Sequence, residues 1–255
     1  MPDSRSPDIP PVLPWRIAAP SWVVPGGPGE NCRLLARHRR FFDEVELLFF
    51  ETRACLAYTE ADLPADLARL GLSFHVHLPA DLDWSRGAAG PAEVIAALAA
   101  KAAHLAPRAY VLHPPPDPAL LGPLARALAA AGLAPGDLLL ENVRGHDLTA
   151  AWPDLVRHGL SACLDLGHLL AYGQQRLLEI PDLWDRVRML HCCAPGPDGR
   201  HLGLARLDPA GRACLGRMLE RLDPAATVAI EVFDLAECLD SRRVLAQIAP
   251  QGRTP

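Results

Sequence analysis

Asp165 and His168 stand three residues apart, directly after an apolar run that ends at Leu164. The run has the length and composition of a buried strand. A carboxylate and an imidazole at this spacing, just beyond a strand, can turn toward one point and bind a cation there. The same spacing also occurs in ordinary turns, so it indicates a metal site only where other strands end in the same kind of residue.

Nearly every other apolar run with strand character also ends in a histidine or an acid. In chain order these residues are Glu51, His77, His113, Glu141, Asp165, His191 and Glu231, with His168 and His201 in the loops just after. A fold that gathers its strand ends at one mouth brings these side chains together. Several imidazoles and carboxylates then predict a divalent metal site, and Zn, Mn, Co or Fe suits such ligands better than Ca.

Three nearby residues each have two interpretations. His75 precedes His77 by two residues and so points to the same face of its strand, either as a second ligand or as a residue deeper in the fold. Glu46 lies within a strand and Glu51 lies beyond it, and either could bind metal. Solvent exposure explains Glu51 equally well.

Strand-like and helical segments alternate eight times, which predicts an α/β fold with a single (β/α)8 TIM barrel. The strands are short and apolar on both faces, as expected between a barrel core and a ring of helices. Such barrels carry their active site at the carboxyl ends of the strands. We expect strands at 15–22, 45–50, 72–78, 109–113, 137–141, 161–165, 187–191 and 226–231, and helices at 30–40, 63–70, 92–105, 118–131, 148–158, 177–184, 207–222 and 235–248.

The barrel is expected to occupy residues 15–250 as one catalytic domain. Residues 1–14 are rich in Pro and polar residues and predict a disordered arm, and residues 251–255 form a tail. No apolar run approaches the roughly 20 residues that span a bilayer. The first residues also lack the apolar segment of a secretory signal. These features predict a cytoplasmic protein without a membrane partner.

The charge balance and the cysteines limit the possible partners. The chain has 255 residues, 25 basic and 30 acidic, with a formal net charge of -5 and no basic block. This argues against a nucleic-acid partner. The seven cysteines include no CxxC pair, so we expect no disulfide framework. The adjacent Cys192 and Cys193 are interpreted as packing residues, with a thiolate ligand as the alternative.

Several segments share the pattern of a known superfamily. They are Phe-Asp-Glu-Val-Glu-Leu-Leu-Phe-Phe-Glu at 42–51, His-Val-His-Leu-Pro-Ala-Asp-Leu at 75–82, Ala-Tyr-Val-Leu-His at 109–113, Glu-Asn at 141–142, Asp-Leu-Gly-His-Leu-Leu-Ala-Tyr-Gly at 165–173, Leu-His at 190–191 and Ala-Ile-Glu-Val-Phe at 229–233. Together they resemble the xylose-isomerase-like TIM barrels, which include endonuclease-IV-type AP endonucleases and sugar-phosphate isomerases and epimerases. Within that superfamily the chain is most similar to the cobamide-remodelling phosphodiesterases, the CbiR family. The resemblance covers almost the whole chain after residue 14.

This resemblance implies that the chain hydrolyses a phosphoester in the nucleotide loop of a cobamide. The reaction would release the lower-ligand nucleoside part from the corrinoid. The endonuclease-IV-like pattern implies the metal ligands His77, His113, Glu141, Asp165, His168, His191, His201 and Glu231. Its Asp-x-His motif is incomplete here, because Gly199 stands two residues before His201. One or two divalent ions are therefore expected, and a third is not.

The implied mechanism is metal-assisted hydrolysis, with Glu141 bridging two ions that bind the phosphodiester and acidify a water. His191, His201 or Arg200 would neutralise charge that develops on the phosphoryl oxygens. The proton acceptor is one of three carboxylates that the sequence leaves open, Glu231, Glu141 or Asp165.

Three other functions fit the same residues. A sugar isomerase or epimerase would use Glu141 and Glu231 as an acid/base pair across one metal, although the histidines exceed a one-metal set. An AP endonuclease is disfavoured by the missing basic stripe. A non-catalytic metal- or corrinoid-binding protein would bind its ligand without turnover. The fold alone does not decide, because this barrel supports many chemistries.

Overall fold

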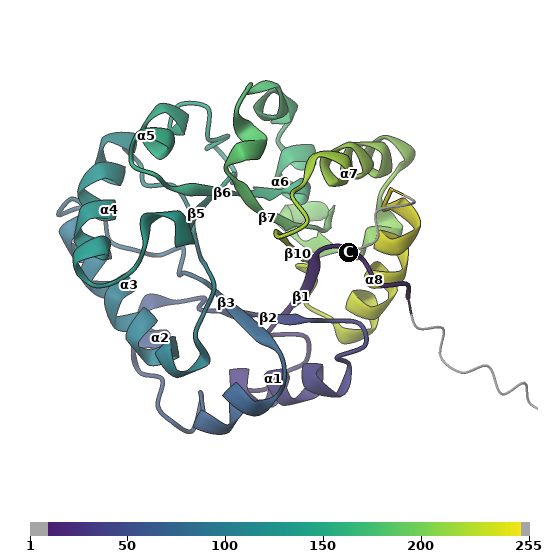
Figure 1. Cartoon of the computed structure of the whole chain (residues 1–255), viewed down its shortest axis with the longest axis horizontal. Helices are drawn as coiled ribbons and strands as arrows, with labels where there is room; N and C mark the ends of the chain where they lie inside the picture. The colour runs from purple at the N-terminus through teal and green to yellow at the C-terminus, as the bar shows by residue number, and fades with distance from the viewer. Residues whose placement is uncertain (1–9, 251–255) are drawn as a thin grey trace, which may run out of the picture.

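The computed structural model describes residues 10–250, in which eight parallel strands close into a barrel (Figure 1). The strands are β1 (Arg16–Pro20), β2 (Glu44–Leu48), β3 (Ser73–His77), β4 (Tyr110–Leu112), β5 (Leu138–Glu141), β6 (Ser161–Asp165), β7 (Val187–His191) and β10 (Thr227–Ala229). Around the barrel their order is β1-β10-β7-β6-β5-β4-β3-β2. The predicted single (β/α)8 TIM barrel is therefore confirmed.

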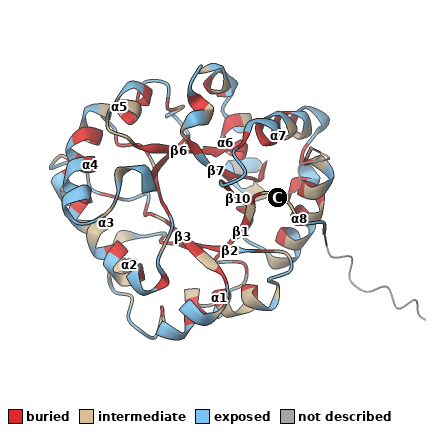
Figure 2. Cartoon of the chain, in the orientation of Figure 1, coloured by how far each residue is buried: buried red, intermediate tan, exposed pale blue. Residues whose placement is uncertain are grey.

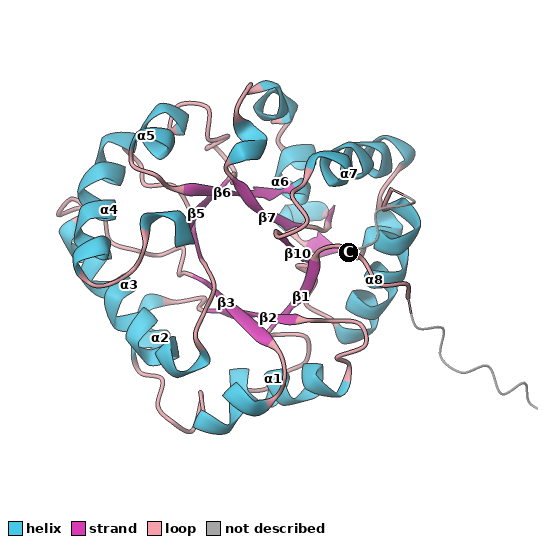
Figure 3. Ribbon diagram, viewed as in Figure 1, coloured by secondary structure: helices cyan, strands magenta, loops and turns pink. Residues whose placement is uncertain are grey.

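Helices form the outer ring, as Figure 3 shows by colour. The α-helices are α1 (Pro28–Arg37), α2 (Thr52–Leu56), α3 (Ala89–Ala102), α4 (Leu121–Ala130), α5 (Trp152–Arg157), α6 (Leu166–Ala171), α7 (Pro209–Arg221) and α8 (Leu235–Ile248). The 3-10 turns are η1 (Ala65–Arg69), η2 (Ala103–Leu105), η3 (Pro118–Leu120), η4 (Pro135–Asp137), η5 (Gln175–Glu179), η6 (Leu183–Asp185), η7 (Pro197–Gly199) and η8 (Leu204–Arg206). The helices turn exposed faces outward and buried faces toward the strands (Figure 2).

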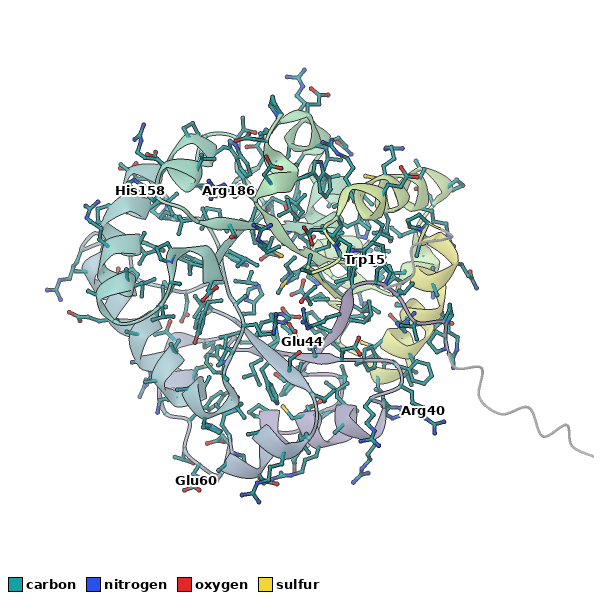
Figure 4. The ribbon with its side chains drawn as sticks, in the orientation of Figure 1. Trp15, Arg40, Glu44, Glu60, His158 and Arg186 are labelled. Carbon is teal, nitrogen blue, oxygen red and sulfur yellow. The ribbon has the colours of Figure 1, made fainter. Side chains whose placement is uncertain are left out.

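The barrel interior contains an apolar cluster and several buried polar side chains. Val111, Leu139, Cys163 and Met189 form a small apolar cluster separate from the core between strands and helices. On the other side Glu44 reaches into the barrel, whereas Arg40 and Glu60 lie at the periphery (Figure 4). Alternation along each strand sends every second residue inward, so a polar interior face continues toward the carboxyl ends of β2 and β3.

Some elements differ from the sequence prediction. The helix expected at 148–158 begins only at Trp152, because Leu148 adopts a left-handed conformation with φ 63°. The helix expected at 177–184 is replaced by the two turns η5 and η6. The elements that were not predicted include α2, α6 and a two-stranded hairpin of β8 (Ala194–Pro195) and β9 (His201–Leu202). Two of these, α6 and the hairpin, carry predicted metal ligands.

The described end of the predicted N-terminal arm is packed against the barrel. Pro10 is buried, and the Pro11 carbonyl accepts a 2.6 Å hydrogen bond from Arg242 of α8. These contacts lie at the amino-terminal end of the barrel. The rest of the predicted arm (residues 1–9) and the tail (251–255) lie outside the described residues. Within residues 10–250, no helix is long and apolar enough to cross a membrane.

Candidate metal centre

One set of ligand-type side chains lies at the ends of β3, β4 and β5. His77 is the last residue of β3, His113 follows β4, and Glu141 ends β5. The Nε2 atoms of both histidines are 3.2 Å from Oε2 of Glu141. Because neighbouring parallel strands end side by side, three residues far apart in sequence form one candidate cation site.

A second set lies beside the first and shares Glu141 with it. Asp165 ends β6, His191 ends β7, and Glu231 lies two residues beyond β10. Nδ1 of His191 is 2.9 Å from Oε1 of Glu141 and 3.3 Å from Oε2 of Glu231. Ligand atoms of Glu141, Asp165, His191 and Glu231 all lie within 4.8 Å of one another. The two oxygens of Glu141 therefore face two different ligand sets, as in a carboxylate that bridges two cations.

Several buried polar atoms in this region lack a hydrogen-bond partner. They are Oδ2 of Asp165, Oε2 of Glu231, Nε2 of His191 and both carboxylate oxygens of Glu46. Buried polar atoms are almost always paired in folded proteins, since an unpaired one is costly. A divalent cation would satisfy these atoms, and oxygen and imidazole nitrogen are suitable donors for it. The residues present therefore fit the predicted metal centre.

Three of the histidines are oriented by backbone carbonyls. Nδ1 of His77 lies 3.0 Å from the Leu78 carbonyl, Nδ1 of His168 lies 2.9 Å from the Asn142 carbonyl, and Nδ1 of His201 lies 3.1 Å from the Glu231 carbonyl. Each bond fixes the ring and leaves Nε2 as the nitrogen available to a ligand. Metal-binding histidines are commonly held in this way.

Glu46 and His75 occupy different layers of the barrel interior. Glu46 is fully buried, and its Oε1 lies 3.6 Å from Nε2 of His191, so it belongs to the metal centre. Its ligand atom also lies within 4.8 Å of His77, His191 and Glu231. His75 lies deeper, where its Nδ1 is 2.6 Å from Oε1 of Glu44. Of the interpretations open for His75, the deeper position is the one observed.

Asn142 holds the backbone of the candidate ligand Asp165 through hydrogen bonds, and sequence reasoning missed this role. Its Oδ1 accepts a 2.7 Å hydrogen bond from the Asp165 backbone N–H, and its Nδ2 donates to the Asp165 carbonyl at 3.0 Å. Nδ2 also donates to Oε1 of Gln174 at 2.9 Å. The only signal in the sequence is its place directly after Glu141, and an Asn after a strand is common.

Two cavities open beside the centre. One, of about 220 Å³, is lined by His77, His113, Glu141 and Glu231 together with aromatic side chains. The other, of about 470 Å³, is lined by Arg144 and Arg200. His168 and His201 line both cavities. Arg200 is exposed in the loop between β8 and β9, and Glu51 is exposed before α2, so neither lies among the buried ligand atoms.

Without a cation, the buried carboxylates and imidazoles shift one another's pKa values. Burial acts to lower the pKa of His77, but Glu141 outweighs it and raises this pKa to about 9. Burial raises the pKa of Asp165 to about 6 against the opposing charge of His168. Burial acts to raise the pKa of Glu141, yet His191 and hydrogen bonds from imidazoles hold it well below the usual range. At neutral pH, His77 is thus protonated beside an ionised Glu141.

Cation affinity is expected to rise with pH, because an incoming cation must displace the His77 proton below about pH 9 and the Asp165 proton below about pH 6. Each displaced proton contributes up to about tenfold in cation affinity per pH unit.

The stability of the metal-free fold should show the opposite trend and fall as the pH rises. Because folding raises the pKa of His77, its proton stabilises the metal-free fold fully below the unfolded pKa of 6.5. This stabilisation is lost as the pH rises through about 9. Thermal unfolding with and without Zn²⁺, measured near pH 6 and near pH 9, tests both expectations. A metal-induced shift in Tm that is the same at the two pH values would contradict them.

Comparison with known proteins gives matches at the level of the fold. No protein-family model matches the chain, and a search of curated proteins finds no match. An L-ribulose 3-epimerase is similar at 19% identity over 94% of this chain and 100% of that chain, with a TM-score of 0.62. The 3-keto-D-glucoside 4-epimerase of E. coli is similar at 15% identity over 92% and 98%, with a TM-score of 0.62.

A sugar phosphate isomerase/epimerase of Parabacteroides distasonis is similar at 12% identity over 91% of this chain and 96% of that chain, with a TM-score of 0.61. At these identities the similarity concerns the fold. It extends over nearly the whole length of each chain. This chain therefore shares the (β/α)8 barrel fold of these proteins.

Proposed function

We propose that the chain is a divalent-metal phosphodiesterase that hydrolyses the nucleotide-loop phosphodiester of cobamides. The observation that carries this proposal is the carboxylate of Glu141, whose two oxygens face separate ligand sets. Paired cations held close together are the usual apparatus for displacement at a phosphoester. Proton transfer on a sugar needs only one of the two sets. The sequence resemblance to cobamide-remodelling phosphodiesterases supports the same substrate.

When bound, the cations would acidify a water and offset the charge of the phosphoryl oxygens. Glu231 is then the best placed proton acceptor, because it lines the cavity of about 220 Å³ and its Oε2 makes no hydrogen bond. Asp165 does not line that cavity, and the two oxygens of Glu141 are divided between two ligand sets. His201 also lines the cavity, with its Nδ1 held by the Glu231 carbonyl.

An aromatic rim at the mouth of the barrel supports a substrate with a flat apolar part. The rim consists of Trp22, Phe50 and Phe233, which are 43%, 51% and 38% exposed. Ring centroids are 6.1 Å apart between Trp22 and Phe50 and 6.3 Å apart between Phe50 and Phe233. Phe233 stacks on His201 at 5.4 Å, so the rim continues into the metal centre. Such rings favour stacking on an aromatic base or a macrocycle.

Phe50→Ala is expected to raise KM for a cobamide about tenfold, since one stacking ring contributes about 1–3 kcal/mol, while kcat changes little. Steady-state kinetics measures both constants. Val12→Ala is the control, because Val12 is also exposed but lines the amino-terminal cavity beside Trp15. An unchanged KM in Phe50→Ala would remove the rim from substrate binding.

The proposed function is tested by incubating the metal-loaded protein with cobalamin and separating the corrinoids by chromatography. We expect a cobinamide-type product that no longer forms after a chelator is added. Absence of product with Zn, Mn, Co and Fe would refute the proposal.

A sugar(-phosphate) isomerase or epimerase is the second candidate, favoured by the fold comparisons and by one detail of the site. Glu141 and Glu231 both contact Nδ1 of His191, so two carboxylates lie in one ligand set as an acid/base pair would. Such an enzyme would exchange a carbon-bound hydrogen of a ketose with solvent. Incorporation of deuterium from heavy water, without phosphodiester cleavage, would favour this candidate.

A further inference from the structure

Cys193 lies at the wall between the metal centre and the cavity of about 470 Å³. Its side chain is buried and lines this cavity together with His168 and His201. Ligand atoms of Cys193, Asp165 and His201 all lie within 4.8 Å of one another. This trio differs from the two sets that share Glu141, because it contains sulfur and lacks Glu141, although it shares Asp165 with the second set.

The local fold creates this juxtaposition. Cys193 directly precedes β8, and β8 pairs with β9 so that Pro195 lies opposite His201. The hairpin thereby folds the imidazole of His201 back toward the thiol of Cys193. On the other side is Gly167, at the start of α6, where an added Cβ would collide with Sγ of Cys193. The thiol reaches Asp165 only because residue 167 has no side chain.

Two observations indicate that the trio is more than packing. Asp165 is fully buried; its Oδ1 accepts from the His168 backbone N–H, but its Oδ2 has no hydrogen-bond partner. The Nδ1 of His201 is held by the Glu231 carbonyl at 3.1 Å, and the ring also makes a side-chain hydrogen bond with Cys193. An unpaired buried carboxylate oxygen beside a thiol and an oriented imidazole has the donors of a cation site.

We propose that Cys193, Asp165 and His201 bind a further divalent cation, with Cys193 as a thiolate. One sulfur, one nitrogen and one oxygen ligand suit zinc or cobalt better than manganese or magnesium. Three protein ligands leave a fourth tetrahedral position, which would open to the cavity. Binding breaks the S–H bond, forms a metal–sulfur bond and releases one proton to solvent.

The geometry requires only a modest adjustment. Bond lengths to sulfur, nitrogen and oxygen of about 2.0–2.3 Å place tetrahedral ligand atoms about 3.3–3.8 Å apart. The observed atoms lie within 4.8 Å of one another, so the ligands would move inward by about an ångström. Asp165 also belongs to the set around Glu141, so its carboxylate would join the further cation to that set. The inference does not depend on the reaction.

Titration of the full-length, metal-stripped protein with Co²⁺ tests this proposal. Thiolate coordination produces a near-ultraviolet charge-transfer band that oxygen and nitrogen ligands do not give. We expect the wild-type protein to show this band, with the amplitude of one thiolate-bound Co²⁺ per chain once all sites are filled. Cys193→Ser should lose the band and bind one equivalent less, while keeping the ions held by the other sets.

Two other cysteines serve as matched controls. Cys192 is equally buried and adjacent in sequence but belongs to no candidate ligand group among the described residues. Cys163 lies in a group with Glu141 and His191 and could also supply a thiolate. Cys192→Ser and Cys163→Ser should both keep the band. A wild-type protein without the band, or a band that survives Cys193→Ser, would overturn the proposal.

A measurement that does not use Cys193→Ser covers the case in which that variant does not fold. X-ray absorption of the zinc-loaded wild-type protein and of Cys163→Ser should both show a zinc–sulfur distance of about 2.3 Å. Failure to detect sulfur around zinc in either sample would contradict the proposed ligand. Activity enters neither experiment, so failure of the cobamide hypothesis would leave this result unaffected.

Discussion

Glu141→Gln is expected to lower the rate of phosphodiester hydrolysis by about a thousandfold or more while the barrel still folds. The amide keeps the shape of the side chain but loses the charge that both ligand sets share. One of its two oxygens is also replaced by an N–H donor, which faces either His191 or the pair His77 and His113. Without a bridging carboxylate, the acidified water and the Lewis acid of metal-assisted hydrolysis are lost together.

Metal content and kinetics should be measured on the same samples. The variant is expected to bind fewer than the wild-type number of ions at equal free Zn²⁺. Glu51→Gln is the matched control, since Glu51 also follows a strand but is exposed to solvent. It should retain the full metal content. If Glu141→Gln retained wild-type metal content and turnover, the two-set arrangement could not be the catalytic centre.

The strand-end residues could be predicted from the sequence because chain order and barrel topology suffice to place them. An apolar run that ends in His77, Glu141 or Asp165 puts that residue at the mouth whatever the exact register. Glu46 was undecidable by the same logic. Its position within β2 gives its face, but only the contact of its Oε1 with His191, at 3.6 Å, shows that it reaches the metal centre.

The role of Asn142 could not be predicted from the sequence, and His201 was predicted as a ligand without the hairpin that places it. The position of His201 depends on the β8–β9 hairpin, whose strands are two residues each and leave no periodic signal. Asn142 contributes through hydrogen bonds to the backbone of Asp165, and any residue could have been the partner there. A metal ligand can be predicted from a sequence by its residue type, whereas a residue that orients a ligand can be identified only from its contacts in the structure.

The buried charges also link the stability of the fold to its cation. Glu46, Glu141, Asp165 and Glu231 are all buried within one small volume. Like charges so close are unfavourable in a poorly hydrated site. The histidine protons compensate in the metal-free protein, and a cation would take over that role. We therefore regard metal binding and folding as coupled in this chain.

Asn142→Ala is expected to weaken cation affinity by about 10–100-fold although Asn142 is not among the candidate ligands. Asn142 holds both the N–H and the carbonyl of Asp165, and its own carbonyl orients His168. Alanine would leave the Asp165 peptide groups buried and unpaired. We expect a loss of about 2–4 kcal/mol in the free energy of unfolding, and a carboxylate that no longer points consistently at the cation.

Asn31→Ala separates lost stability from lost orientation. Asn31 is also fully buried, and its Oδ1 accepts from the backbone N–H groups of Val23 and Val24. It has no place in the metal centre, so its replacement should cost similar stability and leave cation affinity unchanged. Both variants should be unfolded in denaturant and titrated with Zn²⁺ well below their Tm. Equal affinities in the two variants would mean that Asn142 stabilises the barrel without orienting Asp165, because a purely structural defect would affect both proteins alike.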